Sequence, residues 1–241
     1  GSTPSASNVI DYFEIQTLGN ALDFGDMTST TAGGGGIPSP VRGVFSGGYS
    51  GDRTRIDLIT VASKGNAFRF GELSFGRGGA STGGNGVRGI TASGEGTSKT
   101  NTIDYINIAS EGNAIDFGDT GQIHTETMGS SCNNVRMVIA GGNSPGQQPM
   151  SDMDFITIAT TGNGQDFGDL NAPMGNQDIG VASDCVRGLF SRGYHSGGGP
   201  GEINTIEFVQ IATLGNGQDF GDCNGSGKSG GMAMSNSHGG L

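Results

Sequence analysis

The chain has 241 residues, of which 49 are glycine and 32% are apolar. No run approaches the ~20 apolar residues of a membrane helix, and glycine does not recur at every third position as in collagen. The 12 basic and 23 acidic residues give a net charge of -11, which repels nucleic acid. Three cysteines without CxxC spacing form neither a disulfide framework nor a zinc site: Cys132, Cys185 and Cys223.

One pattern recurs five times, in copies that start near residues 10, 56, 103, 153 and 206. The first copy reads IDYFEIQTLGNALDFGD and the fifth reads IEFVQIATLGNGQDFGD. A second element precedes four of the copies: VRGVFSGGY (41–49), VRGITASGE (87–95), VRMVIAGGN (135–143) and VRGLFSRGY (186–194). A repeat of ~45–50 residues is typical of propeller blades.

Each copy predicts a pair of β-strands. The string IDYINIAS (103–110) alternates apolar and polar residues and is rich in β-branched and aromatic ones. Gly112-Asn113 follows, and this pair predicts a tight hairpin turn because both residue types tolerate positive φ. The return strand AIDFGD carries one large core residue, Phe117.

The segments between the copies predict two further strands. The VRG element reads as a strand with small residues at its end. Stretches rich in Gly, Ser and Thr leave room for a short inner strand and long loops: residues 33–36, 76–86 and 225–231. A unit of three or four antiparallel strands is a propeller blade in size and content. We therefore predict an all-β, five-bladed, kelch-like propeller that forms one domain over residues 1–241.

The two ends of the chain predict how the ring closes. The first copy lacks a preceding VRG element, so we expect the C-terminal segment to supply a strand of that blade. Two registers place either Met234 or His238 at the arginine position, and the interval from Asp222 favours His238. Closure of the ring would remove the exposed strand edges that invite aggregation.

The repeats resemble known proteins. The Gly-Gly pair after an apolar strand resembles a shortened kelch-type repeat, with phenylalanine at the place of the usual tryptophan: Phe24, Phe70, Phe117, Phe167 and Phe220. The strings MDFITIATTGNGQDFGDL (153–170) and VRGLFSRGY (186–194) resemble repeats of virion and tail-fibre proteins of marine bacteriophages, cyanophages included. The resemblance covers nearly the whole chain and implies a propeller located in the virion.

The repeated acids allow two interpretations. Four copies carry a pair of aspartates around Phe-Gly: Asp23 and Asp26, Asp116 and Asp119, Asp166 and Asp169, Asp219 and Asp222. Carboxylates at this spacing can share a calcium ion. Alternatively, each accepts backbone N–H bonds and stabilises a turn. The second copy has Arg69 and Glu72 instead, which argues against one metal per blade. We therefore expect neither a metal site nor a cofactor. Calcium binding by the paired aspartates is the alternative.

Four arginines stand at the repeated VR position: Arg42, Arg88, Arg136 and Arg187. One interpretation is an ion pair with the repeated acids between neighbouring strands or blades. The other is a ring of arginines around the channel that holds an anionic sugar or sulfate.

Two loops carry candidate sugar-binding residues. His195 lies beside Tyr194 in a Gly-rich loop, and Tyr49 is the equivalent of Tyr194 in an earlier unit. An aromatic ring with a polar neighbour can stack on a sugar and bind it by hydrogen bonds. A plain surface loop is the other interpretation.

We predict a non-enzymatic virion module that presents its loops to a host-cell surface, with a glycan as the expected ligand. Similar sites on five blades would bind with avidity. One alternative is a structural connector of a phage tail with other virion proteins as partners, which predicts apolar patches on one face. Another is a glycoside hydrolase, but no unique pair of carboxylates stands out from the repeats, and we expect no catalytic residues. Neither nucleic-acid binding nor membrane insertion is expected.

Overall fold

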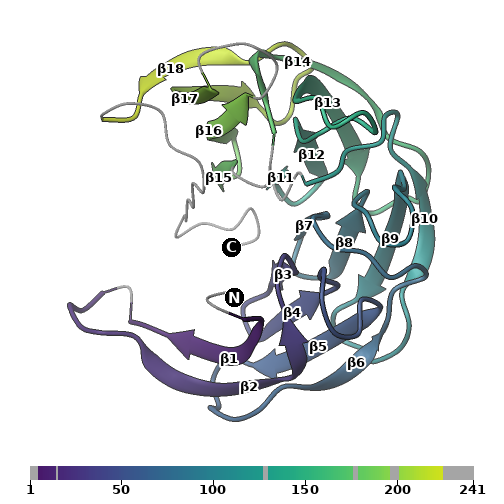
Figure 1. The fold of residues 1–241 in the computed structure, drawn as a ribbon, viewed down its shortest axis with the longest axis vertical. Coiled ribbons are helices and arrows are strands. Elements are labelled where there is room, and N and C mark those ends of the chain that lie inside the picture. The colour runs from purple at the N-terminus through teal and green to yellow at the C-terminus, as the bar shows by residue number, and fades with distance from the viewer. Residues whose placement is uncertain (1–4, 15, 127–129, 176–178, 196–200, 225–241) are drawn as a thin grey trace.

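The structure is a computed structural model that describes residues 5–14, 16–126, 130–175, 179–195 and 201–224. All regular elements in these residues are β-strands, which form four four-stranded antiparallel sheets and one two-stranded sheet. The sheets stand side by side in an arc, as the blades of a propeller do (Figure 1). No helix in the described part of the chain is long and apolar enough to cross a membrane.

The two-stranded sheet comes first in the chain and is called the N-terminal sheet; it contains β1 (Ser7–Tyr12) and β2 (Leu22–Thr31). Blade 1 contains β3 (Gly35–Pro38), β4 (Arg42–Ser46), β5 (Arg55–Thr60) and β6 (Phe68–Glu72). Blade 2 contains β7 (Ser81–Gly84), β8 (Arg88–Ala92), β9 (Thr102–Asn107) and β10 (Ile115–Asp119). Blade 3 contains β11 (Ser130–Cys132), β12 (Arg136–Ala140), β13 (Met150–Thr157) and β14 (Gln165–Met174). Blade 4 contains β15 (Gly180–Ser183), β16 (Arg187–His195), β17 (Gly201–Gln210) and β18 (Gln218–Asp222).

The strands predicted from the repeat are confirmed. Within each blade the strands pair in chain order, so the VRG element is the second strand and the IDY element is the third. The short first strands of neighbouring blades contact one another near the centre of the arc. Small residues are needed there: a Cβ on Gly83 of β7 would collide with the Cys132 sulfur of β11.

The predicted five-bladed ring is present only in part. The structure has four complete blades, and the first repeat copy forms only β1 and β2, the counterparts of the third and fourth strands of a blade. The strand expected near Met234 or His238 lies outside the described residues. Ring closure is therefore not observed in the described chain, and Figure 1 shows an open side between β18 and the N-terminal sheet.

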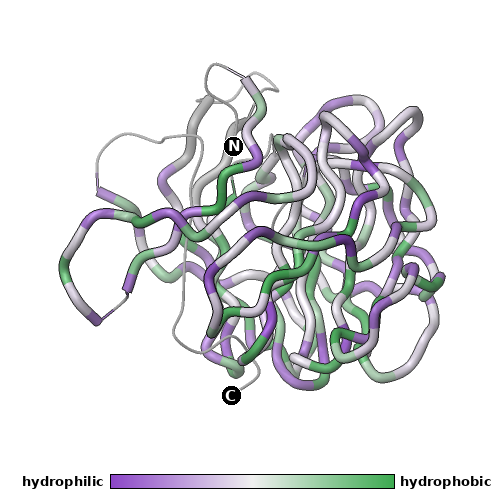
Figure 2. The backbone as a smooth tube through the Cα atoms, turned by 90° about the horizontal axis from the view of Figure 1, so that it is seen from below, coloured by the Kyte–Doolittle hydropathy of each residue, from purple (hydrophilic) through white to green (hydrophobic). Residues whose placement is uncertain are grey.

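The hydrophobic core consists of clusters between blades. Phe117, Ile90 and Ile103 of blade 2 pack with Met137 and Ile156 of blade 3. Similar clusters join blade 1 to blade 2 and blade 3 to blade 4. In the side view, hydrophobic stretches run through the body of the disc (Figure 2). Because each blade is covered by its neighbours, the blades depend on one another for burial.

One predicted core residue is exposed. The repeated phenylalanines Phe24, Phe70, Phe117 and Phe167 are at most 8% exposed, but Phe220 on the last outer strand is 52% exposed. Phe220 still packs edge-to-face against Phe208 of its own blade, with ring centroids 6.2 Å apart. The physical reason is that no sheet covers β18 among the described residues.

Replacing Phe117 with alanine should lower the free energy of unfolding by roughly 3–5 kcal/mol, because it removes a buried ring between two blades. Urea denaturation of the purified variant measures this loss. Ile115→Ala on the same strand is the control, since Ile115 is 58% exposed, and it should change stability by under about 0.5 kcal/mol. Equal losses for the two variants would contradict the assigned core.

Candidate functional site

Neighbouring sheets are joined by one contact that recurs at four consecutive junctions, and the Gly-Asn pair makes it. The amide of Gly65 donates to the carbonyl of Phe24 at 2.9 Å, and the amide of Ala67 donates to the carbonyl of Asp26 at 2.8 Å. Between these bonds, Asn66 Oδ1 accepts the amide of Asp26 at 3.0 Å. The outer strand of one sheet is thus held by the segment before the outer strand of the next. We call this contact the Gly-Asn latch.

The other three junctions repeat the latch with the same atoms. The glycine amides donate to a phenylalanine carbonyl at 2.8–3.0 Å in the pairs Gly112–Phe70, Gly162–Phe117 and Gly215–Phe167. The asparagine Oδ1 atoms accept a backbone amide at 3.1 Å in the pairs Asn113–Glu72, Asn163–Asp119 and Asn216–Asp169. Four equal contacts between different pairs of sheets show that the repeat encodes the junction as well as the blade.

The Gly-Asn pair is therefore not the hairpin turn that the sequence predicted. The turn after β5 closes earlier, where the amide of Ser63 donates to the carbonyl of Thr60 at 3.1 Å. Gly65 has a positive φ, whereas Asn66 does not. The facing strand also needs a glycine, because a Cβ on Gly71 would collide with the carbonyl of Gly112.

A second junction contact uses an acid in the third strand of each blade: Asp57, Asp104, Asp154 and Glu207, each at most 5% exposed. Asp104 accepts the amide of Ser74 at 3.1 Å and its hydroxyl at 2.7 Å, and Ser74 follows the outer strand of blade 1. At the last junction Glu207 accepts the amide of Asn171 at 2.8 Å. Each buried carboxylate thus satisfies main-chain donors of the preceding blade.

Two of these acids form an ion pair with a buried arginine, and a third contacts a buried histidine. Arg55 lies 2.8 Å from Asp57, and Arg77 lies 3.0 Å from Asp104, with both arginine side chains 0% exposed. His124 Nε2 lies 3.3 Å from Asp154. Burial lowers the pKa of the Arg77 guanidinium, and the charge of Asp104 opposes this effect.

These acids were not predicted as functional, although the sequence carries a signal for them. Asp57, Asp104, Asp154 and Glu207 occupy the second position of strings such as IDL, IDY and IEF, between apolar residues of a buried strand. An acid at this place in every copy needs a partner, since an unpaired buried charge is costly.

Three of the predicted arginines bind the main chain of the next blade. Arg42 Nη1 donates to the carbonyl of Ile108 at 2.6 Å, Arg88 Nη1 donates to that of Ile158 at 3.1 Å, and Arg136 Nη1 donates to that of Ala212 at 2.8 Å. They form no ion pair with the repeated acids among the described residues. The predicted ion pair is therefore wrong for them: the repeat brings backbone carbonyls, not carboxylates, to the guanidinium.

Arg187 of blade 4 differs from its counterparts. Its Nε lies 3.8 Å from Asp184, and the side chain is 44% exposed. All four arginines begin the second strand of a blade, one strand outward from the innermost. Arg88 and Arg136 also lie 4.6 Å from the ring centroids of Tyr105 and Phe155. Binding of an anion by these arginines stays a prediction.

The structure separates the two predicted tyrosines. Tyr49 follows β4 in a loop, and its ring packs against the backbone at Gly33, Gly78 and Gly79, where a Cβ would collide with it. Tyr194 lies within β16, where its backbone pairs with Glu202. The two tyrosines are therefore not in equivalent places, and the Tyr49 ring holds its loop in position.

His195 ends β16, and its backbone pairs with Gly201 of β17. The Gly-rich loop predicted at this point is thus partly an extended strand pair. The side chains of Tyr194 and His195 lie outside the described residues. A role for either of them in sugar binding stays a prediction.

Two of the acids around Phe-Gly stabilise their own strand. Asp166 Oδ1 accepts the amide of Gly168 at 3.0 Å, and Asp219 Oδ1 accepts that of Gly221 at the same distance. Across the described residues, no group of three or more His, Cys, Asp and Glu side chains is placed to hold a metal ion. Calcium binding stays untested.

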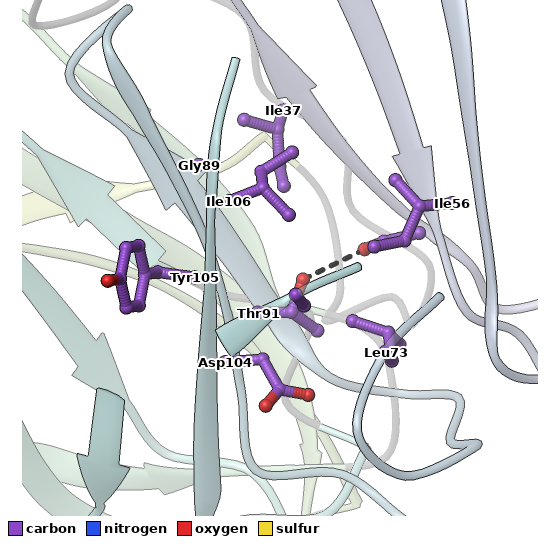
Figure 3. A pocket seen from close by; sticks show the side chains of 10 residues that line it. Ile37, Ile56, Leu73, Gly89, Thr91, Asp104, Tyr105 and Ile106 are labelled. Carbon is purple, nitrogen blue, oxygen red and sulfur yellow. Dashed lines mark hydrogen bonds between the residues drawn. The ribbon is translucent and has the colours of Figure 1, made fainter. Parts of the chain in front are cut away.

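A narrow gap lies between blades 1 and 2. Figure 3 shows Ile37, Ile56, Leu73 and Ile106 around it, and the hydroxyls of Ser46 and Thr91 meet there at 3.0 Å. The gap is too narrow to hold a water molecule. We assign it to the packing of the two blades.

No protein-family model matches the chain, and no curated protein matches it.

Replacing Asn113 with alanine removes the acceptor of the Glu72 amide at one junction. The free energy of unfolding should fall by about 1 kcal/mol, the usual worth of one such bond. Glu111→Ala is the matched control, because Glu111 is an exposed residue of the same loop. Chemical denaturation should separate the two variants, and an unchanged stability of Asn113→Ala would contradict the latch.

Replacing Asp104 with alanine leaves the Arg77 guanidinium buried without its counter-charge. We expect a loss of roughly 3–5 kcal/mol in the free energy of unfolding. Asp116→Ala in the same blade, at an exposed position, should change it by under about 0.5 kcal/mol. A loss below about 1 kcal/mol for Asp104→Ala would refute the assigned role of the pair.

Proposed function

We propose that the protein is a non-enzymatic virion module that presents loops to a host-cell surface and binds a glycan there. The resemblance of its repeats to virion and tail-fibre proteins of marine bacteriophages motivates the location. The constant junctions motivate the role of a rigid scaffold, because they hold the blades while leaving the connecting loops free to vary.

The observation that carries the proposal is the contrast between constant junctions and variable loops. The segments that join the second strand of a blade to the third are 47–54, 93–101 and 141–149, and they read GGYSGDRT, SGEGTSKTN and GGNSPGQQP. They occupy the same place in three blades, and hence the same face of the arc. Polar, variable loops on a rigid frame are typical of recognition surfaces. We call this face the variable face.

We further propose that the first repeat becomes a fifth blade, so that the arc is a closed propeller. The intervals Asp26–Arg42 and Glu72–Arg88 are both 16 residues, and the same interval from Asp222 reaches His238. Phe13 of the first repeat is 51% exposed, while its counterparts Ile106 and Ile156 are at most 5% exposed. Ile106 and Ile156 each pack against the preceding blade, so contact with blade 4 in a closed ring would cover Phe13, while residues 225–241 would supply the two inner strands.

A connector role in a phage tail is the second candidate, and one observation favours it. The turn between the first and second strands carries an exposed valine in four blades: Val41, Val87, Val135 and Val186, at 57–62% exposure. Equivalent positions place these valines on one face, where they could contact another virion protein. We call them the valine row.

Thermal unfolding against a panel of glycans, with calcium and EDTA, tests the leading proposal. A sugar at about ten times its Kd should raise the Tm by roughly 3–6 °C, because only the folded state binds it. Arg53→Ala lies on the variable face at an exposed position, and it should reduce this shift. Val87→Ser in the valine row is the matched control and should leave the shift unchanged.

Two outcomes would overturn the leading proposal. One is the absence of any shift with sugars together with no binding to host cells. The other is capture of a virion protein that Val87→Ser and Val135→Ser abolish while Arg53→Ala does not, which would support the connector.

A further inference from the structure

We infer that a fifth Gly-Asn latch forms between Gly19-Asn20 of the N-terminal sheet and Phe220–Asp222 of β18, and that it closes the fold on itself. The inference rests on the proposed five-bladed ring and adds the contact that seals it. The interaction surface is the outer edge of β18, and its partner is the opposite end of the same chain.

On the β18 side, the residues that form a latch at the other junctions are exposed, and no described residue contacts them in that way. Phe220 is 52% exposed, although its four counterparts are at most 8% exposed. A Cβ on Gly221 would meet nothing within 4 Å, whereas one on the equivalent Gly168 would collide with the backbone of Gly215. The other four outer strands have their carbonyls and amides paired across a junction, so β18 is the exception.

The N-terminal side is equally exposed. Gly19 and Asn20 occupy the positions of the four latch pairs in the first copy. Ala21 is exposed, while the equivalent Ala67 is 8% exposed. Both views show the segment between β1 and β2 standing away from the rest of the fold (Figures 1 and 2).

The residues that form the buried-acid contact at the other junctions also have exposed counterparts on both sides of the open side. Asn171 of blade 3 donates its amide and its Nδ2 to Glu207, at 2.8 and 3.0 Å. The equivalent residues at the open side are Asn224 and Asp11, and both are exposed. The chain thus carries the donor and the acceptor of a fifth contact at its two ends.

Arg187 is a third residue whose contact with a following blade is not formed among the described residues. Its counterparts Arg42, Arg88 and Arg136 each donate to a carbonyl of the following blade. Arg187 instead stays 44% exposed beside Asp184. The following sheet in a closed ring would be the N-terminal sheet.

The partner is the same chain rather than a second copy. The two halves flank one open side of the arc (Figure 1). Their covalent connection gives each a high effective concentration of the other. A head-to-tail contact between copies would leave one half unpaired at each end and would propagate into a fibre.

The existing junctions predict a distance that can be tested. A Cβ on Gly164 would lie 3.3 Å from the Thr120 Cα, and one on Gly217 would lie 3.4 Å from the Leu170 Cα. At the fifth junction the equivalent pair is Ala21 and Cys223. A Cβ this close to the Cα of the facing residue places the two positions within reach of a disulfide bond.

The experiment is therefore one substitution, Ala21→Cys, followed by mild oxidation of the full-length protein. Peptide mapping without reduction should find a Cys223 disulfide to the new cysteine in the monomer, with near-complete loss of both thiols. The oxidised variant should also have a higher Tm than the reduced one. Burial raises the pKa of the Cys132 thiol to about 12, which keeps it from competing as a thiolate.

Two controls fix the meaning of the result. Thr120→Cys with Gly164→Cys, in a Cys223→Ser background, places the same pair at a junction that is already formed, and it should cross-link. Ala21→Cys with Cys223→Ser removes the proposed partner and should not give the monomeric disulfide.

The outcomes separate cleanly. Failure of Ala21→Cys to cross-link, while the formed-junction control succeeds, would overturn the closure. A disulfide between two chains at the same position would also overturn it, in favour of a second copy. Glycan binding is measured independently. Formation of the disulfide without glycan binding would contradict the proposed function and support the latch. Glycan binding without the disulfide would support the proposed function and contradict the latch.

Discussion

The main-chain hydrogen bonds between one outer strand and the next Gly-Asn pair are the constraint on which the rest of the fold depends. Two backbones must approach closely enough to exchange N–H and C=O groups across a boundary between sheets. A side chain on the facing glycine would prevent this approach, as the collision predicted at Gly71 shows. The sequence therefore keeps Phe-Gly on one side and Gly-Asn on the other in every copy.

The buried acids act on the same boundary from the inside. Asp104 and its counterparts lie in the third strand, where they accept hydrogen bonds from main-chain donors of the preceding sheet, and at three of four junctions they also meet a buried arginine or histidine side chain. These side chains come from different places in each repeat, namely Arg55, Arg77 and His124. The repeat thus fixes the acid and its main-chain donors, but it does not specify the side chain that meets the acid.

The sequence was sufficient to predict the strands, their order within a blade and the phenylalanine core between blades. These features follow from local alternation and from the repeat itself. It misassigned the Gly-Asn pair, because positive φ at a glycine looks the same in a turn and in a contact between blades. It also paired the arginines with acids, because the charge pattern cannot show that a carbonyl of the next blade, such as that of Ile108, lies closer.

The exposed Phe220 has a related explanation. The equivalent phenylalanines of the other four copies are buried by the following blade, so the burial of Phe220 depends on whether the arc closes. A local pattern predicts a core phenylalanine at every copy, but it cannot say that the last copy needs the first as its cover. The N-terminal sheet, with its own exposed Phe13, shows the same dependence from the other end.

Native-state hydrogen exchange at the latch glycines tests the central claim most directly. If the latches hold the blades together, the amides of Gly65, Gly112, Gly162 and Gly215 should exchange as slowly as amides in the middle of the strands. The amide of Gly19 should be protected to a similar degree if the same contact closes the ring. Fast exchange at the four formed junctions would contradict the claim that the Gly-Asn pair joins one blade to the next.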